Sequence, residues 1–148
     1  MDMPPTADGY DSILVFVCTY CKYTILIPMC SKGLISPELR ANYKQYAGKS
    51  TAWDSARLAY KSYKKLFSMF GLPLSIRTDG QRSLIKGIWP DLMKLFGMEQ
   101  LVGTAMSSDS NGVAENKIKQ LRRMFTPLMQ KSGSTSWKFA TPTVQAIA

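Results

Sequence analysis

Two acidic residues occupy positions at which α/β proteins carry out carboxylate chemistry. The segment 74–79 has the pattern of a short strand that ends on Asp79, beside Gly80. Ligands of α/β sheets bind just outside the carboxyl ends of the strands. Glu115 lies in the first turn of a predicted helix, directly after a polar Ser/Asn/Gly segment. Each acid also has an ordinary structural interpretation, Asp79 as a turn residue and Glu115 as a partner of the helix dipole.

The composition limits which chemistry these acids could perform. The 148 residues include 19 Lys and Arg, 10 Asp and Glu, and no His, which gives a net charge of +9. Without His, the chain can form no Ser-His-Asp triad, no HExxH zinc site and no His general base. Carboxylate oxygens suit hard cations such as Mg²⁺, which need neither His nor Cys. The positive charge favours an anionic partner, nucleic acid first, with a purely solubilising charge as the alternative.

The elements that position the two acids follow from hydrophobic periodicity and from Gly and Pro breakers. The predicted strands cover 12–18, 23–28, 74–79 and 98–106. The predicted helices cover 51–70, 84–96 and 113–131, with a further helix from near Phe139. Residues 31–50 are a variable connection that could hold a short helix from Pro37. This order predicts one α/β domain over residues 1–148, with a mixed β-sheet covered by helices.

The three cysteines, Cys18, Cys21 and Cys30, are too few for a disulfide framework and favour a reducing, intracellular compartment. The Cys18-x-x-Cys21 spacing is compatible with zinc or redox chemistry. A tetrahedral zinc site would need a second Cys pair or His ligands, and the sequence offers neither. We therefore expect the cysteines to be buried as small hydrophobic residues. No signal peptide is expected, and no apolar run approaches the ~18–20 residues that a membrane span needs.

The spacing between Asp79 and Glu115 is more informative than either acid alone. Positions 79 and 115 differ by 36, so 35 residues lie between them, predicted as a loop, a helix, a strand and a loop. Here the sequence resembles the catalytic core of retroviral-type integrases, most closely those of gypsy-type long-terminal-repeat retrotransposons, which carry a D, D-35-E signature. The likeness covers nearly the whole chain in the right order. Its main segments are 9–17, 22–28, 70–79 and 111–115.

This resemblance implies a ribonuclease-H-like fold, in which a mixed β-sheet is flanked by helices, and a role in DNA integration. The implied reaction is divalent-metal-dependent polynucleotidyl (strand) transfer, with Asp79 and Glu115 as catalytic ligands of Mg²⁺ or Mn²⁺, two ions in a complete site. Water or a DNA 3′-hydroxyl attacks in line, without a covalent enzyme intermediate. The implied partners are the DNA of the element ends, target DNA and further copies of the chain, without a membrane. The implied location is the nucleus.

The first aspartate of the signature leaves two interpretations open. The family places it in the first strand, upstream of the segment that begins at Gly9, and only Asp2 is available there. Either Asp2 is the first ligand on a shortened connection, or the chain begins after that strand and the first ligand is absent. In the second case the chain is incomplete at its start, and the early stop of the helix near Phe139 makes it incomplete at both ends. It would then be a catalytically inactive remnant that binds nucleic acid or dimerises.

Three further residues are candidates for DNA binding. Lys119 and Arg122 follow Glu115 at i+4 and i+7 and therefore share one helix face with it. The resemblance implies that they contact DNA near the reactive end, and the alternative is a solvated face with a Glu–Lys pair. Asn111 could hydrogen-bond a phosphate or base, or simply form a turn before Gly112. A ribonuclease-H-type nuclease is a third hypothesis, against which the 35-residue spacing argues.

Overall fold

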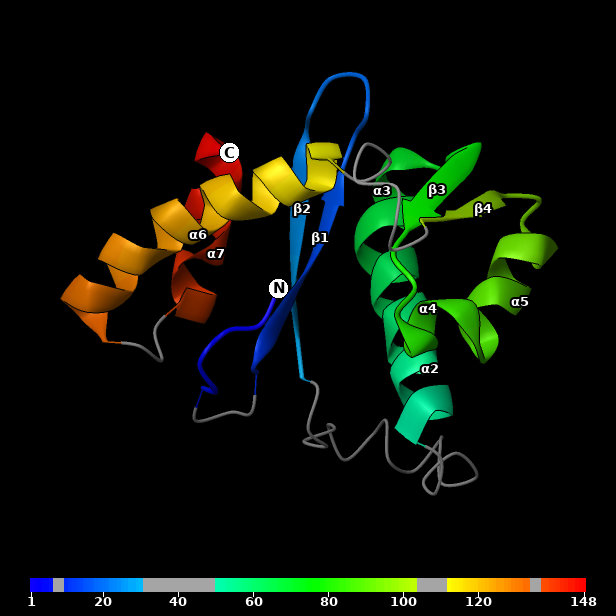
Figure 1. The fold of residues 1–148 in the computed structure, drawn as a ribbon, viewed down its shortest axis with the longest axis horizontal. Helices are drawn as coiled ribbons and strands as arrows, with labels where there is room; N and C mark the ends of the chain where they lie inside the picture. Colours follow the sequence, from blue (N-terminus) through cyan, green and yellow to red (C-terminus); the bar gives the residue numbers. More distant parts are fainter. Residues whose placement is uncertain (7–9, 31–49, 104–111, 134–136) are drawn as a thin grey trace. The chain divides into compact units, whose positions relative to one another are not determined.

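The computed structural model describes the chain as strands and helices in two compact units (Figure 1). The described residues are 1–6, 10–30, 50–103, 112–133 and 137–148. Unit 1 joins two distant segments, Met1–Ser36 and Gly112–Ala148, and unit 2 is the intervening segment Pro37–Asn111. Strands and helices occur in both units, which confirms the predicted α/β class.

Unit 1 is built on an antiparallel hairpin. Strand β1 (Ser12–Val17) pairs with β2 (Thr24–Met29), in a register that runs from Ser12 opposite Met29 to Val17 opposite Thr24. Helix α6 (Gly112–Ser132) packs against β1, helix α7 (Trp137–Ile147) packs against β2, and the two helices contact each other (Figure 1). The two predicted strands, the long helix and the start of α7 are therefore confirmed to within two residues.

The core of unit 1 joins one face of the hairpin to the helices. Leu121 and Phe125 are one turn apart on α6 and are almost fully buried, as their helical spacing predicted. The full cluster consists of Ile13, Leu26, Leu121, Phe125, Trp137 and Val144. Two polar contacts fix α7: Trp137 Nε1 donates to Pro4 O at 2.6 Å, and Gln145 Oε1 accepts from Leu26 N at 3.0 Å. Pro127 lies inside α6, which continues to Ser132.

The described part of unit 2 begins with a long helical segment. It consists of α2 (Ser50–Ser62), a π-helical turn η2 (Tyr63–Phe67) and the short α3 (Ser68–Phe70). Gly71, at φ +81°, ends it as predicted, because residues with a side chain rarely adopt that conformation.

Two parallel strands and two short helices complete unit 2. Strand β3 (Ser75–Thr78) pairs with β4 (Glu99–Val102), from Ser75 opposite Glu99 to Thr78 opposite Val102. Between them lie α4 (Arg82–Ile85) and α5 (Ile88–Leu95). The prediction of one helix over 84–96 is wrong, because Lys86 is extended and Gly87 adopts φ +88°. Of the predicted strand 98–106, residues 104–106 lie outside the described residues.

The described strands form two separate two-stranded sheets, β1–β2 and β3–β4. The β1–β2 pair is antiparallel and the β3–β4 pair is parallel, and a single mixed sheet stays a prediction. None of the helices in the described part of the chain is long and apolar enough to cross a membrane.

Candidate functional site

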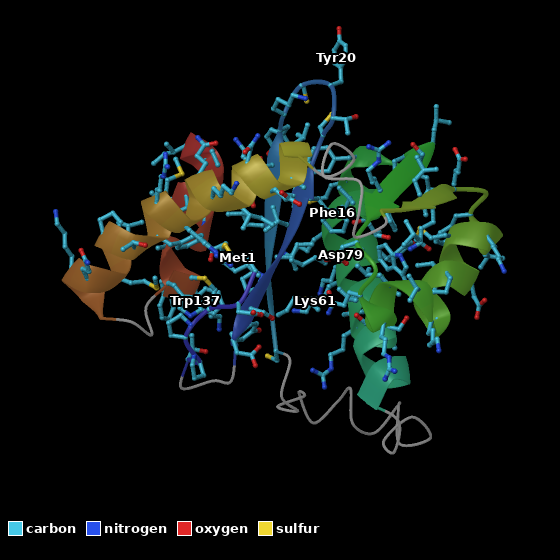
Figure 2. The ribbon with its side chains drawn as sticks, viewed as in Figure 1. Met1, Phe16, Tyr20, Lys61, Asp79 and Trp137 are labelled. Carbon is cyan, nitrogen blue, oxygen red and sulfur yellow. The ribbon has the colours of Figure 1, made fainter. Side chains whose placement is uncertain are left out.

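Asp79 lies at the carboxyl edge of the parallel β3–β4 pair. It directly follows β3, is exposed, and accepts a hydrogen bond on Oδ1 from the backbone N–H of Gln81 at 3.1 Å (Figure 2). At the same edge, Gly103 N donates to Thr78 O at 2.8 Å. The carboxylate therefore forms the turn between β3 and α4, while its remaining lone pairs could accept a cation. The predicted strand-end position of Asp79 is confirmed, and so is its role in a turn.

The backbone before Asp79 is held by a residue that the sequence analysis did not single out. Gln100, on β4, donates through Nε2 to Thr78 Oγ1 at 3.0 Å and to Leu84 O at 2.8 Å. One side-chain amide thus connects β4, β3 and α4 directly below the turn that carries Asp79. The only sequence signal was a polar residue in a short predicted strand.

Glu115 lies in the first turn of α6 and is exposed. Lys119 and Arg122 are also exposed. Lys119 lies on the side of the helix away from the buried Leu121 and Phe125, whereas Arg122 lies one turn before Phe125, at the border of the buried face. All three charged side chains therefore face solvent, and their part in DNA binding stays a prediction. An acid near the N-terminus of a helix is stabilised by the helix dipole, so this position also suits a purely structural role.

Asp2 lies on an extended segment that pairs with β1. Met3 N donates to Asp11 O at 2.8 Å, Ile13 N donates to Met1 O at 2.8 Å, and Asp2 forms a single antiparallel bridge with Ser12. Met1 and Met3 pack against the core of unit 1, whereas Asp2 is exposed. Because side chains alternate along an extended segment, the carboxylate of Asp2 faces away from that core.

The three predicted acids lie in two units. Asp79 belongs to unit 2, and Asp2 and Glu115 belong to unit 1. Among the described residues, no group of three or more His, Cys, Asp or Glu side chains could hold a metal ion. The exposed carboxylate oxygens of these acids fit a hard divalent cation chemically. A site shared by Asp79 and Glu115 stays a prediction, and Asn111 lies outside the described residues.

The cysteines differ from the expectation of burial. Cys18 and Cys21 are exposed in the turn between β1 and β2, and Cys30 is half-buried after β2. The prediction that they are buried is wrong for the first two, because the ladder of the hairpin ends at Val17 and Thr24 and leaves residues 18–23 beyond the core.

A scan of the chain against protein-family models gives no match, and a search among curated proteins also gives none.

Proposed function

We propose that this chain is the catalytic core of a retrotransposon-type integrase and transfers DNA strands with the help of divalent metal ions. The observation that carries the proposal is the setting of two acids with 35 residues between them. Asp79 follows a strand at the carboxyl edge of a parallel pair, and Glu115 occupies the first turn of a long helix. In the proposed site both carboxylates hold the same Mg²⁺ or Mn²⁺, and Asp2 is the candidate third ligand.

The order of elements supports a ribonuclease-H-like fold. An antiparallel hairpin comes first, followed by a helix, a parallel strand pair with helices between its strands, and a long helix. The pairing of Asp2 beside β1 supports the interpretation that residues 1–3 contribute to a first strand. The strand would be short, because Pro4 and Pro5 cannot donate hydrogen bonds to a ladder.

In this mechanism the residues of the chain bind and position DNA. When bound, divalent ions would activate the attacking hydroxyl and stabilise the leaving oxygen. Asp79 and Glu115 supply oxygen ligands. Lys119 and Arg122 are exposed on the same helix as Glu115 and bind DNA phosphates near the reacting bond. Asn111 is a further proposed DNA contact. The net charge of +9 supports an anionic substrate. Element-end and target DNA, assembly with further copies of the chain and a nuclear location belong to the same proposal.

A catalytically inactive, nucleic-acid-binding or dimerising domain is the second candidate. Two observations favour it: Asp2 is held by a single bridge and faces away from the core of unit 1, and Asp79 already accepts a hydrogen bond in its turn. In that case Lys119 and Arg122 bind DNA without any turnover.

Strand transfer and disintegration on labelled oligonucleotides, with Mg²⁺ or Mn²⁺, test the proposal. Asp79→Asn and Glu115→Gln should each abolish turnover while DNA binding is retained, because each removes a charged metal ligand. Asp91→Asn is the matched control, since Asp91 is an exposed acid in the first turn of another helix, α5, and should leave turnover unchanged. Salt-sensitive DNA binding without turnover in the unaltered chain would establish the second candidate instead.

A further inference from the structure

The turn between β1 and β2 brings two thiols together at a tight bend. Lys22 N donates to Cys18 O at 3.0 Å, and Cys18 N donates to Tyr23 O at 2.9 Å, so residues 18–22 form one closed turn. Lys22 adopts φ +62°, which reverses the chain directly after Cys21. An i→i+4 bond closes a single α-turn, which brings residues i and i+3 close together, and a disulfide needs Cα atoms about 4.4–6.8 Å apart. The backbone therefore suits a bond between Cys18 and Cys21.

The side chains of the same turn favour an ionised sulfur on Cys18. The pKa of the Cys18 thiol is lowered, first by a hydrogen bond from the backbone of Cys21, then by one from the Cys21 side chain, with a smaller contribution from the charge of Lys22. Both thiols belong to the same closed backbone turn, which places Cys21 close to Cys18. Since the thiolate is the attacking form of cysteine, Cys18 is the nucleophile of the pair.

The pair is accessible to molecules in solution. Cys18 and Cys21 are both exposed, and Tyr20 between them is 95% exposed and points outward from the tip of the hairpin (Figure 2). Cys30 lies at the opposite end of the hairpin, after the residue that pairs with Ser12, and is half-buried. It therefore provides an internal reference thiol in the same unit.

We propose that Cys18 and Cys21 form a thiol–disulfide exchange site that reacts with low-molecular-weight disulfides such as oxidised glutathione. The Cys18 thiolate attacks one sulfur of the disulfide, which forms a mixed disulfide and releases one thiolate. Cys21, after losing its proton, attacks the sulfur of Cys18 and releases the second thiolate. Two protein thiols are thereby oxidised to one disulfide, and one disulfide is reduced to two thiols, which take up the two protons.

Tryptic cleavage of the whole chain separates the three cysteines. Cleavage follows Lys22 and Lys32, so Cys18 and Cys21 lie in the peptide 1–22 and Cys30 lies in the peptide 23–32. After incubation with oxidised glutathione and alkylation of remaining thiols, we expect the peptide 1–22 to be lighter by two hydrogen atoms and to resist alkylation. The peptide 23–32 should react at least about tenfold more slowly, because its thiol is less exposed.

Variants identify the role of each thiol. Cys21→Ser should accumulate the glutathione adduct on Cys18, because no second thiol resolves it. Cys18→Ser should form an adduct on Cys21 at least about fivefold more slowly, since the activated thiol is gone. Cys30→Ser is the matched control and should oxidise like the unaltered chain. These readouts do not involve DNA or turnover, so they succeed or fail independently of the integrase proposal.

Three outcomes would overturn the proposal. A stable glutathione adduct on Cys18 in the unaltered chain would show that Cys21 does not resolve it. Equal yields of disulfide in the folded chain and in the chain unfolded by urea would show that the turn contributes nothing. Protection of both thiols by added Zn²⁺ at a ratio of one ion to two chains would identify the pair as half of a metal site between two copies.

Discussion

Ser55 stabilises unit 2 through its hydroxyl, and the sequence alone does not reveal this role. Ser55 lies on α2, is completely buried, and accepts a hydrogen bond from the backbone N–H of Trp89 at 2.8 Å. This bond fixes the start of α5 on helix α2. Periodicity identifies apolar faces but cannot distinguish a buried Ser from an exposed one, which is also why the contacts of Gln100 were missed.

We expect Ser55→Ala to lower the free energy of unfolding by about 1–3 kcal/mol, because the buried N–H of Trp89 loses its acceptor. Chemical denaturation monitored by Trp fluorescence measures the change. Ser75→Ala, at an exposed position of β3, is the control and should change stability by less than about 0.5 kcal/mol. Equal effects of the two substitutions would contradict the structural role given to Ser55.

Gly71 permits a second residue-level prediction. At φ +81° it ends the helical segment from α2 to α3, and a Cβ placed there would meet no atom within 4 Å. Any effect of Gly71→Ala is therefore backbone strain alone, and we expect a loss of about 1–2 kcal/mol in thermal or chemical unfolding. Gly80→Ala is the matched control, because Gly80 has equal space without a positive φ. A neutral Gly71→Ala would show that the helix does not need this turn.

At the level of elements, local pattern predicted most of the described structure. The strands 12–17, 24–29 and 75–78 and the helix 112–132 follow from β-branched runs, breakers and helical stripes. The break between α4 and α5 was missed, because Gly87 lies between two helical patterns that are continuous in the sequence. The parallel pairing of β3 with β4 could not be predicted either, since pairing between distant segments leaves no local signal.

Helix α6 should contribute most of the stability of unit 1. Phe125 is 1% exposed and belongs to the cluster that joins both helices to the hairpin. We expect Phe125→Ala to cost about 3–5 kcal/mol, because it leaves a cavity among well-packed side chains. The control Arg123→Ala changes an exposed residue of the same helix and should be nearly neutral in the same denaturation experiment. A loss below about 1 kcal/mol for Phe125→Ala would indicate that α6 is not docked on the hairpin.

For the whole molecule, the positive charge predicts how DNA binding depends on salt. Each phosphate contact releases about one counterion, so replacing Lys119 or Arg122 by Ala should lower the slope of log K against log salt by about one. Fluorescence anisotropy with a labelled duplex over a range of NaCl concentrations measures the slope. Lys94→Ala, at an exposed position of α5, is the control. An unchanged slope in Lys119→Ala and Arg122→Ala would remove these residues from the DNA contact.

The interrupted sequence of unit 1 bears on the order in which the protein is assembled during synthesis. Ile13 and Leu26 leave the ribosome early, but their packing partners Leu121 and Trp137 are translated about a hundred residues later. At about 5–20 residues per second, the apolar face of the hairpin waits for several seconds without its helices. Unit 2, continuous in sequence, can fold during that interval. A nascent chain arrested before α6 therefore exposes the apolar face of the hairpin, which is prone to aggregation. Chaperones would be needed most during this interval.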